Sequence, residues 1–282
     1  MLRCATNWGG SIDSRLKGHL ASFGGDGLPL YRMMGYQMGW IGTDGEESPY
    51  DRSERRVLGS MSVQVAAGFT SQIADPHFDL AASIELLQES INVHLQMQTG
   101  EMGTEDAPEV WWIWGPAQAI NVGDGLHALA RMSTFNAQAK GLSTERTIAA
   151  VQALDRTALT FYEGQYLDLT LQERVDITTK QYLGMAEKRF GSLWAGAFEI
   201  GAIGGSAPIE AQAALSGAGA NLGVAIQIQR DIQELWGSER PPGRLLSKSK
   251  TYPVAYGFEH GTLAQKRALG ESYFKRVIEP AD

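Results

Sequence analysis

Five histidines and one cysteine are the side chains best suited to metal binding or nucleophilic catalysis, and neither type is arranged for it. The histidines form no His-x-x-x-His or His-Glu pair at metal-ligand spacing, which argues against catalytic zinc. Cys4 lies next to the start of the chain and no Gly-x-Ser-x-Gly elbow occurs, so a serine or cysteine hydrolase is not supported. The glycine-rich run at residues 217–223 lacks dinucleotide-binding spacing, and we interpret it as close helix packing.

Composition excludes further classes of protein. Twenty-four basic and thirty-two acidic residues give a net charge of −8, which argues against nucleic acid as a partner. A single cysteine allows no disulfide within the chain and fits a reducing cytosol. The first ten residues lack the pattern of a signal peptide, and no apolar run approaches the ~20 residues of a membrane span. We therefore expect a cytoplasmic protein without a membrane span.

The elements that position any site are expected to be helices. From residue 81 to 237, apolar residues recur at helical spacing and alternating β-branched runs are few, which indicates an all-α fold. Thr178 and Gln181 form a capping box that opens a predicted helix over residues 178–200 with a wide apolar face. We also predict helices at residues 123–132 and 222–236, and short joins containing glycine indicate antiparallel packing.

Several segments taken together resemble the trans-isoprenyl diphosphate synthases, also called polyprenyl synthetases. In the family, a glycine followed by Ala-Ile-Asn-x-Gly-Asp-x-Leu opens a long helix, and residues 115–126 are similar to that motif. The other matching segments follow in family order, at residues 164–169, 182–188, 221–229 and 250–254. The resemblance covers about residue 53 to the end of the chain, while residues 1–52 match weakly. The combination of these segments in this order is specific for the family, although each segment alone is a weak signal.

The resemblance implies both a fold and a reaction. It implies one isoprenoid-synthase-type helical domain over residues 1–282, with the three predicted helices lining a central cavity. Family members ionise an allylic diphosphate and couple the cation to isopentenyl diphosphate. Magnesium neutralises the diphosphate, and two aspartate-rich clusters on facing helices supply its carboxylate ligands.

The first aspartate-rich cluster is lost in this chain. Residues 85–87 fix its register and place His94 on the family's histidine, after which the aspartate positions are Leu95, Gln96 and Thr99. None of these side chains is a carboxylate. The Arg-Arg pair that follows in the family maps near Thr104 and Glu105, and Glu105 would repel a diphosphate. Ser90 and Ile91 lie one turn earlier, at the positions where the family sets product chain length.

The second cluster is half retained. Its three acidic positions are Arg230, Asp231 and Glu234, so two carboxylates remain beside a positive charge. They could form a weakened magnesium site, or simply an exposed acidic pair at i,i+3 spacing. We therefore assign no catalytic residue and no cofactor, and we treat magnesium as a weakened possibility.

The remaining diphosphate ligands of the family are partly retained. Those that the resemblance carries over as substrate-binding candidates are Arg56, His94, Lys188, Gln227, Arg230, Asp231 and Lys250. The family's Lys-Thr pair is here Lys188-Arg189, and the lysine and aspartate of the late loop are Glu239 and Arg244. Arg56, Lys188 and Lys250 could equally be solvated surface charges.

Three functions fit these residues. The first is a non-catalytic or regulatory subunit that dimerises with an active prenyl diphosphate synthase, or with itself. The second is an enzyme that binds a prenyl diphosphate through cations, with little or no magnesium, because guanidinium groups pair with phosphate directly. The third is a carrier of an isoprenoid tail.

Overall fold

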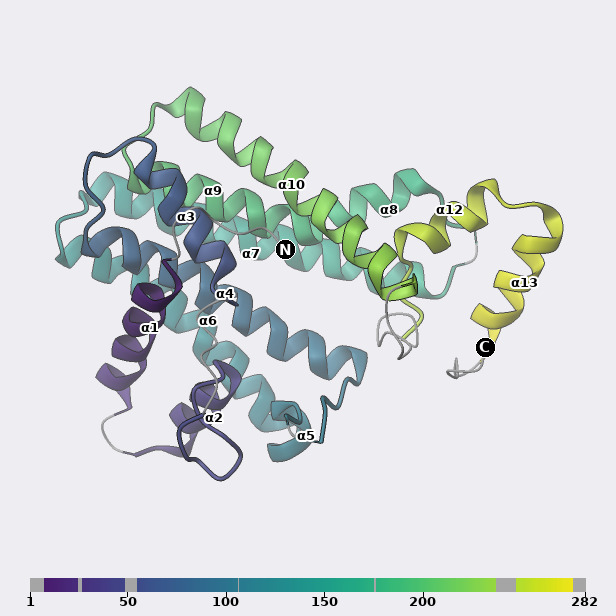
Figure 1. The fold of residues 1–282 in the computed structure, drawn as a ribbon, viewed down its shortest axis with the longest axis horizontal. Helices are drawn as coiled ribbons and strands as arrows, with labels where there is room; N and C mark the ends of the chain where they lie inside the picture. Colours follow the sequence, from purple (N-terminus) through teal and green to yellow (C-terminus); the bar gives the residue numbers. More distant parts are fainter. Residues whose placement is uncertain are drawn as a thin grey trace. The chain divides into compact units, whose positions relative to one another are not determined.

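The computed structural model describes residues 8–24, 27–48, 55–105, 107–174, 176–236 and 247–275. These residues are predominantly helical, and among them only two isolated β-bridges occur and no strand (Figure 1). The all-α prediction is therefore confirmed. The helices are α1 Gly9–Phe23, α2 Pro29–Gln37, α3 Val57–Ala67, α4 Asp75–Thr99, α5 Val110–Trp114, α6 Pro116–Ala139, α7 Thr144–Gln172, α8 Thr179–Ala186, the π-helical turn η2 Glu187–Gly191, α9 Ser192–Gly204, α10 Ile209–Trp236, α12 Tyr252–His260 and α13 Leu263–Phe274.

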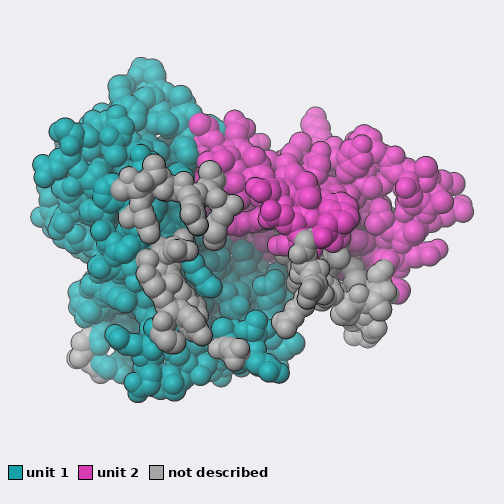
Figure 2. Space-filling view, viewed as in Figure 1, with its two compact units in different colours: residues 1–156, 195–217 teal, residues 157–194, 218–282 magenta. Residues whose placement is uncertain are grey.

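The chain divides into two compact units (Figure 2). Unit 1 comprises residues 1–156 and 195–217, and unit 2 comprises residues 157–194 and 218–282. Helices α7, α9 and α10 each contribute residues to both units. A single domain with a central cavity stays a prediction.

Unit 1 is organised around α4. Helix α6 packs along α4, and α1 and α3 also contact it. The middle of α4 is buried on every side, since its polar Ser83 and Glu85 are enclosed as fully as its apolar Ile84 and Leu87. A helix without an exposed face must satisfy its polar side chains internally. Unit 1 therefore contains buried polar contacts as well as apolar packing.

Unit 2 has its own apolar core, to which α8, α12 and α13 contribute. Tyr182, Met185 and Ala186 of α8 pack in one cluster with Phe258 of α12 and Tyr273 of α13. The predicted capping box is confirmed, because the Thr178 hydroxyl accepts a hydrogen bond from the Gln181 N–H and the Gln181 side chain accepts one from the Thr178 N–H. These local contacts fix where α8 begins.

The predicted helix over residues 178–200 is interrupted by the π-helical turn η2. On the facing helix α7, a Cβ at Gly164 would lie 2.5 Å from the backbone nitrogen of Arg189 and 2.8 Å from the carbonyl carbon of Lys188. Real Cβ atoms do not approach backbone so closely, so glycine is required at this position. The widened turn thus lies directly against α7.

The other predicted helices are confirmed, since residues 123–132 lie in α6 and residues 222–236 in α10. Among the residues that the structure describes, no helix is both long enough and apolar enough to cross a membrane.

Candidate functional site

His94 joins two of the segments on which the family resemblance depends. It projects from α4, and its Nε2 atom lies 3.6 Å from Oδ1 of Asp124 on α6. A Cβ at Gly123 would lie 2.3 Å from the same Nε2 atom. The glycine of the Ala-Ile-Asn-x-Gly-Asp motif therefore makes room for the imidazole. Sequence comparison aligned these residues separately, and the structure brings them together in unit 1.

Leu95, Gln96 and Thr99, the residues that the sequence alignment places at the first aspartate-rich cluster, lie at the C-terminal end of α4. The Thr99 hydroxyl donates to the Leu95 carbonyl of the same helix at 2.9 Å. Helix α4 then ends at Gly100, whose φ of 71° is left-handed. These three residues offer an amide and a hydroxyl, but no carboxylate.

Ser90 and Ile91, the predicted chain-length residues, are fully buried in α4. The Ser90 hydroxyl has no hydrogen-bond partner within the described part of the chain. Both side chains lie inside the packed interior of unit 1, and their role in product length stays a prediction.

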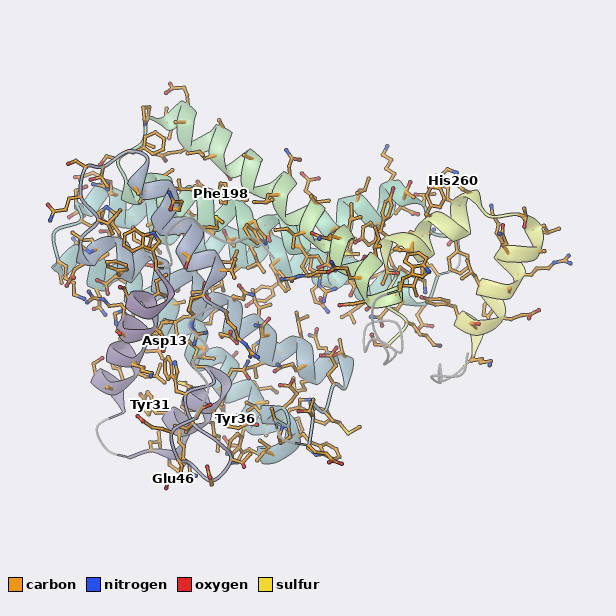
Figure 3. All side chains as sticks on the ribbon, in the orientation of Figure 1. Asp13, Tyr31, Tyr36, Glu46, Phe198 and His260 are labelled. Atoms are coloured by element: carbon orange, nitrogen blue, oxygen red, sulfur yellow. The ribbon has the colours of Figure 1, made fainter. Side chains whose placement is uncertain are left out.

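Arg56 lies in a buried polar cluster of unit 1. One guanidinium nitrogen contacts Asp13 of α1 at 2.9 Å and donates to the Met38 carbonyl at 2.8 Å. Another nitrogen lies 3.7 Å from Glu89 of α4. The Trp40 indole N–H donates to the same Asp13 oxygen, and Asp13 is marked on α1 in Figure 3. Only 1% of Arg56 is exposed, so its charge is used between helices.

Glu85 is buried beside this cluster. It accepts a hydrogen bond from the Gly59 N–H at 2.6 Å, which ties α4 to α3. Burial raises the pKa of Glu85 to about 7; the Arg56 charge and the Gly59 hydrogen bond oppose the rise, while the nearby charge of Glu89 adds to it. Near neutral pH this carboxyl is therefore only partly ionised in the folded chain.

The Glu85→Gln variant is expected to show a weaker dependence of stability on pH than the unchanged protein. Because the folded pKa exceeds the unfolded one, the folded state binds more protons and stability falls as pH rises through the interval between them. The fall should be about 2 kcal/mol between about pH 5 and pH 8. Urea unfolding at several pH values measures it, with Glu210→Gln, an exposed glutamate of α10, as the control. Equal slopes in all three proteins would contradict the assignment.

Asp231 is the centre of a buried polar cluster in unit 2. Its carboxylate accepts hydrogen bonds from the Tyr182 hydroxyl at 2.5 Å, the Gln227 amide at 2.6 Å and the Tyr252 N–H at 2.8 Å. The donors come from α8, α10 and the first residue of α12, where a helix N-terminus favours negative charge. Asp231 has no exposed surface. The Asp231 carboxylate thus links α8, α10 and α12 through hydrogen bonds.

These residues do not fit magnesium. The ion requires a near-octahedral set of oxygen ligands with free lone pairs, whereas both Asp231 oxygens face N–H or O–H donors. Across the described residues, no three His, Cys, Asp or Glu side chains come close enough to share a metal ion. The interpretation of Asp231 and Glu234 as an exposed acidic pair is also wrong, because Asp231 is buried and Glu234 is half-buried.

Lys250 points into unit 2. Its ammonium group donates to the Gln172 carbonyl at 2.8 Å and the Lys248 carbonyl at 3.3 Å, and lies 4.1 Å from the centre of the Tyr273 ring. Burial lowers the pKa of Lys250 to about 8. The interpretation of Lys250 as a solvated charge is therefore wrong, since its side chain is enclosed.

The Lys188-Arg189 pair divides between surface and interior. The side chain of Lys188 is 43% exposed and pairs with Glu163 of α7. Arg189, in η2, is 3% exposed and contacts Oδ2 of Asp168 at 2.7 Å. Arg189, which the sequence alignment places at the family's threonine, therefore forms a buried ion pair with Asp168 of the segment at residues 164–169. Sequence reasoning aligned both residues and missed their contact.

The structure thus distributes the candidate residues among separate contacts. Gln227 and Asp231 share one cluster in unit 2, whereas Lys188 and Lys250 have other partners there, and Arg230 is exposed on α10. Arg56 and His94 belong to unit 1. Two further residues used in the alignment, Glu239 and Arg244 of the late loop, lie outside the described residues.

The helical fold is that of the isoprenyl synthases. It matches the crystal structure of a polyprenyl synthetase from Streptomyces coelicolor A3(2) with a TM-score of 0.83 and 24% identity, over 95% of this chain and 79% of that one. It also matches a geranylgeranyl pyrophosphate synthetase from Pyrococcus horikoshii with a TM-score of 0.79 and 23% identity, over 94% and 77% of the two chains. The polyprenyl synthetase family model matches residues 55–281. The chain belongs to the polyprenyl synthetase family.

Curated relatives include enzymes from Mycobacterium tuberculosis. A (2E,6E)-farnesyl diphosphate synthase is 28% identical over 242 residues, and a geranylgeranyl diphosphate synthase is 30% identical over 233 residues. The matches cover 83% and 80% of this chain, but 65% and 64% of the two relatives. The chain thus spans slightly less than two thirds of the length of each relative.

Proposed function

We propose that this chain is a non-catalytic or regulatory member of the polyprenyl synthetase family that acts in isoprenoid metabolism as a partner of an active prenyl diphosphate synthase. One observation carries the proposal. Asp231, which the alignment places in the second metal cluster, is fully buried and accepts three hydrogen bonds from the protein itself. Because its oxygens already accept these hydrogen bonds, Asp231 is better suited to hold helices together than to bind a metal ion.

The contacts of the retained cations support the same proposal. Arg56 is bound to Asp13 and Lys250 to backbone carbonyls. Arg189, which replaces the family's threonine, is paired with Asp168. These three cations are themselves at most 3% exposed, and cations buried in this way are poor ligands for a diphosphate, because binding would first have to break their internal contacts. We expect a prenyl diphosphate, if bound, to be held weakly.

Exposed apolar side chains support a partner surface. In unit 1, Ile120, Met132 and Phe135 are exposed on α6, with 51% exposure at Phe135. In unit 2, Leu159, Tyr166 and Leu169 are exposed on α7, with 69% exposure at Tyr166. Groups of large apolar residues on helix faces are typical of interfaces. We therefore propose a homodimer, or a heterodimer with an active homologue, in the cytosol.

The purified protein is expected to form no product from geranyl or farnesyl diphosphate, isopentenyl diphosphate and magnesium. The reason is the missing carboxylate set at Leu95, Gln96 and Thr99. Product analysis by chromatography, with an active prenyl diphosphate synthase as the positive control, measures the outcome. Sedimentation of the protein alone and after co-expression with that synthase tests the partner role. Magnesium-dependent elongation by the protein alone would overturn the proposal.

One observation favours the alternative enzyme. Arg230 replaces a family aspartate and is exposed on α10, so its guanidinium is accessible to a phosphate. If it holds a prenyl diphosphate without metal, Arg230→Ala should weaken binding of farnesyl diphosphate in the presence of chelator by roughly tenfold to a hundredfold. We expect no change in titration calorimetry, and a clear loss would favour the alternative.

A further inference from the structure

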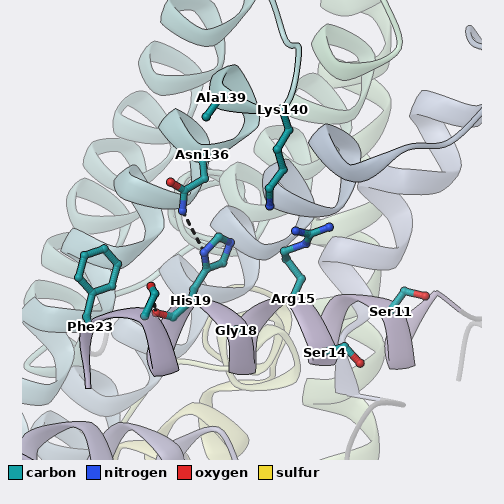
Figure 4. Close-up of a pocket in the computed structure, with 10 residues that line it drawn as sticks. Ser11, Ser14, Arg15, Gly18, His19, Phe23, Asn136, Ala139 and Lys140 are labelled. Carbon is teal, nitrogen blue, oxygen red and sulfur yellow. Dashed lines mark hydrogen bonds between the residues drawn. The ribbon is translucent and has the colours of Figure 1, made fainter. Parts of the chain in front are cut away.

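We propose that a polar groove in unit 1, between α1 and the end of α6, binds a small phosphate-type oxyanion. The groove has a volume of about 520 Å³ and is lined on the α1 side by Arg15 and His19 and on the α6 side by Asn136 and Lys140 (Figure 4). None of these residues belongs to the segments aligned with the family's substrate ligands.

The cationic side chains of the groove are held in place by one buried carboxylate. Asp79 of α4 has no exposed surface and contacts three of the side chains that line the groove. Its oxygens lie 2.9 and 3.1 Å from the Lys140 ammonium, 3.0 Å from His19 Nε2 and 3.6 Å from Arg15 Nε. Arg15 of α1 and Lys140, the residue that follows α6, are therefore held near each other before any ligand binds, which lowers the entropy cost of binding.

The lining of the groove carries the positive charges of its ion pairs. Arg15 and Lys140 carry two positive charges; buried Asp79 balances one, and within the described part of the chain the second is balanced only by Asp75, so an anion has to compete with Asp75 for Arg15. Arg15 also contacts Asp75 at 2.9 Å, but that side chain is 63% exposed and does not line the groove. Among the described residues that do line it, none is acidic. An anion in the groove can therefore replace Asp75 as the partner of the Arg15 guanidinium nitrogen that Asp75 now contacts.

The other lining groups suit the oxygens of a phosphate. Ser11 and Ser14 lie on the groove face of α1, one turn from Arg15 and Gly18. The amide nitrogen of Asn136 lies 3.0 Å from His19 Nδ1, which leaves the proton on Nε2 to face Asp79. The Ser11 hydroxyl and the Arg15 guanidinium match the tetrahedral oxygens of phosphate, and the guanidinium nitrogen that now contacts Asp75 can pair with one of its negative charges.

Gly18 provides a way to close the groove without removing a charge. A Cβ at this glycine would meet no atom within 4 Å, so a side chain would extend into open space. Because glycine is unfavourable in a helix interior, Gly18→Leu should not destabilise α1. The variant separates loss of the groove from loss of the fold.

Titration calorimetry with inorganic phosphate and with inorganic diphosphate, at low ionic strength, tests the proposal. We expect binding of at least one anion at millimolar concentrations or tighter, weakened at least tenfold by Lys140→Gln and by Arg15→Gln and abolished by Gly18→Leu. The two anions distinguish a single phosphate from a diphosphate as the ligand.

One variant serves as the control and should bind like the unchanged protein, and a second variant distinguishes the groove from the family site. Lys17→Gln removes an exposed cation of α1 that does not line the groove, and Arg230→Gln removes the exposed cation of the family alignment. No binding of either anion to the unchanged protein would overturn the proposal. If Lys17→Gln weakened anion binding as much as Lys140→Gln does, the binding would be a general effect of surface charge and not of the groove. If only Arg230→Gln weakened it, the anion would bind at the family site.

Discussion

Replacing Asp231 with alanine should lower the free energy of unfolding by about 3–5 kcal/mol. The change would leave the Tyr182 hydroxyl, the Gln227 amide and the Tyr252 N–H without the acceptor that they now share inside unit 2. A buried donor without an acceptor costs about 1–3 kcal/mol, and the three costs are not strictly additive. Urea unfolding in the presence of a chelator measures the effect.

The same variant distinguishes packing from metal binding. Carboxylates that are positioned to bind a metal contribute little to the free energy of unfolding of the metal-free protein, so removing one is often neutral or stabilising. Arg230→Ala, at the adjacent exposed position of α10, should change stability by no more than about 0.5 kcal/mol and serves as the control. An unfolding free energy that is unchanged or raised in Asp231→Ala would contradict the structural role.

Arg189→Met should cost about 3–5 kcal/mol, because it leaves the Asp168 carboxylate buried without its cation. The double variant Asp168→Leu/Arg189→Met should recover most of this loss, since replacing both partners of a buried ion pair by apolar side chains is often neutral or stabilising. Thermal and urea unfolding of both single variants and the double variant would give the coupling energy between the two residues.

Lys188→Met is the matched control for this cycle. Lys188 precedes Arg189, has the same charge and forms an ion pair at the surface, with 43% of its side chain exposed. Exposed ion pairs contribute about 0–1 kcal/mol, so its loss should be small. A similar cost at both positions, or no recovery in the double variant, would show that the Arg189–Asp168 contact does not stabilise the fold.

Sequence alone predicted the helices well because their signals are local. The capping box at Thr178 and Gln181 and the apolar spacing after it lie within a few turns of one helix. The order of the family segments identified the fold, since each segment could be aligned without knowledge of its contacts. The π-helical turn was missed, because apolar residues keep three- and four-residue steps through residues 187–191.

The contacts of the candidate site could not be predicted in the same way. Asp231 is 49 residues from Tyr182 and 21 residues from Tyr252, and spacing along one helix carries no information about either partner. Arg56 pairs with Asp13, which lies in the segment where the family resemblance is weak. A charged residue has the same sequence pattern whether it is solvated or buried with a distant partner. Only the contacts in the folded structure show whether such a residue is available to a ligand or is used in packing.

The contact between Gly164 and the π-helical turn has an evolutionary consequence. Because a Cβ at residue 164 would overlap the backbone of Lys188 and Arg189, a mutation at this glycine is tolerated only if the turn has already changed. The two positions are therefore epistatic. Among homologous genes, we expect a larger residue at position 164 to coincide with a one-residue deletion within the segment aligned to residues 187–191, which would restore an ordinary α-helix there.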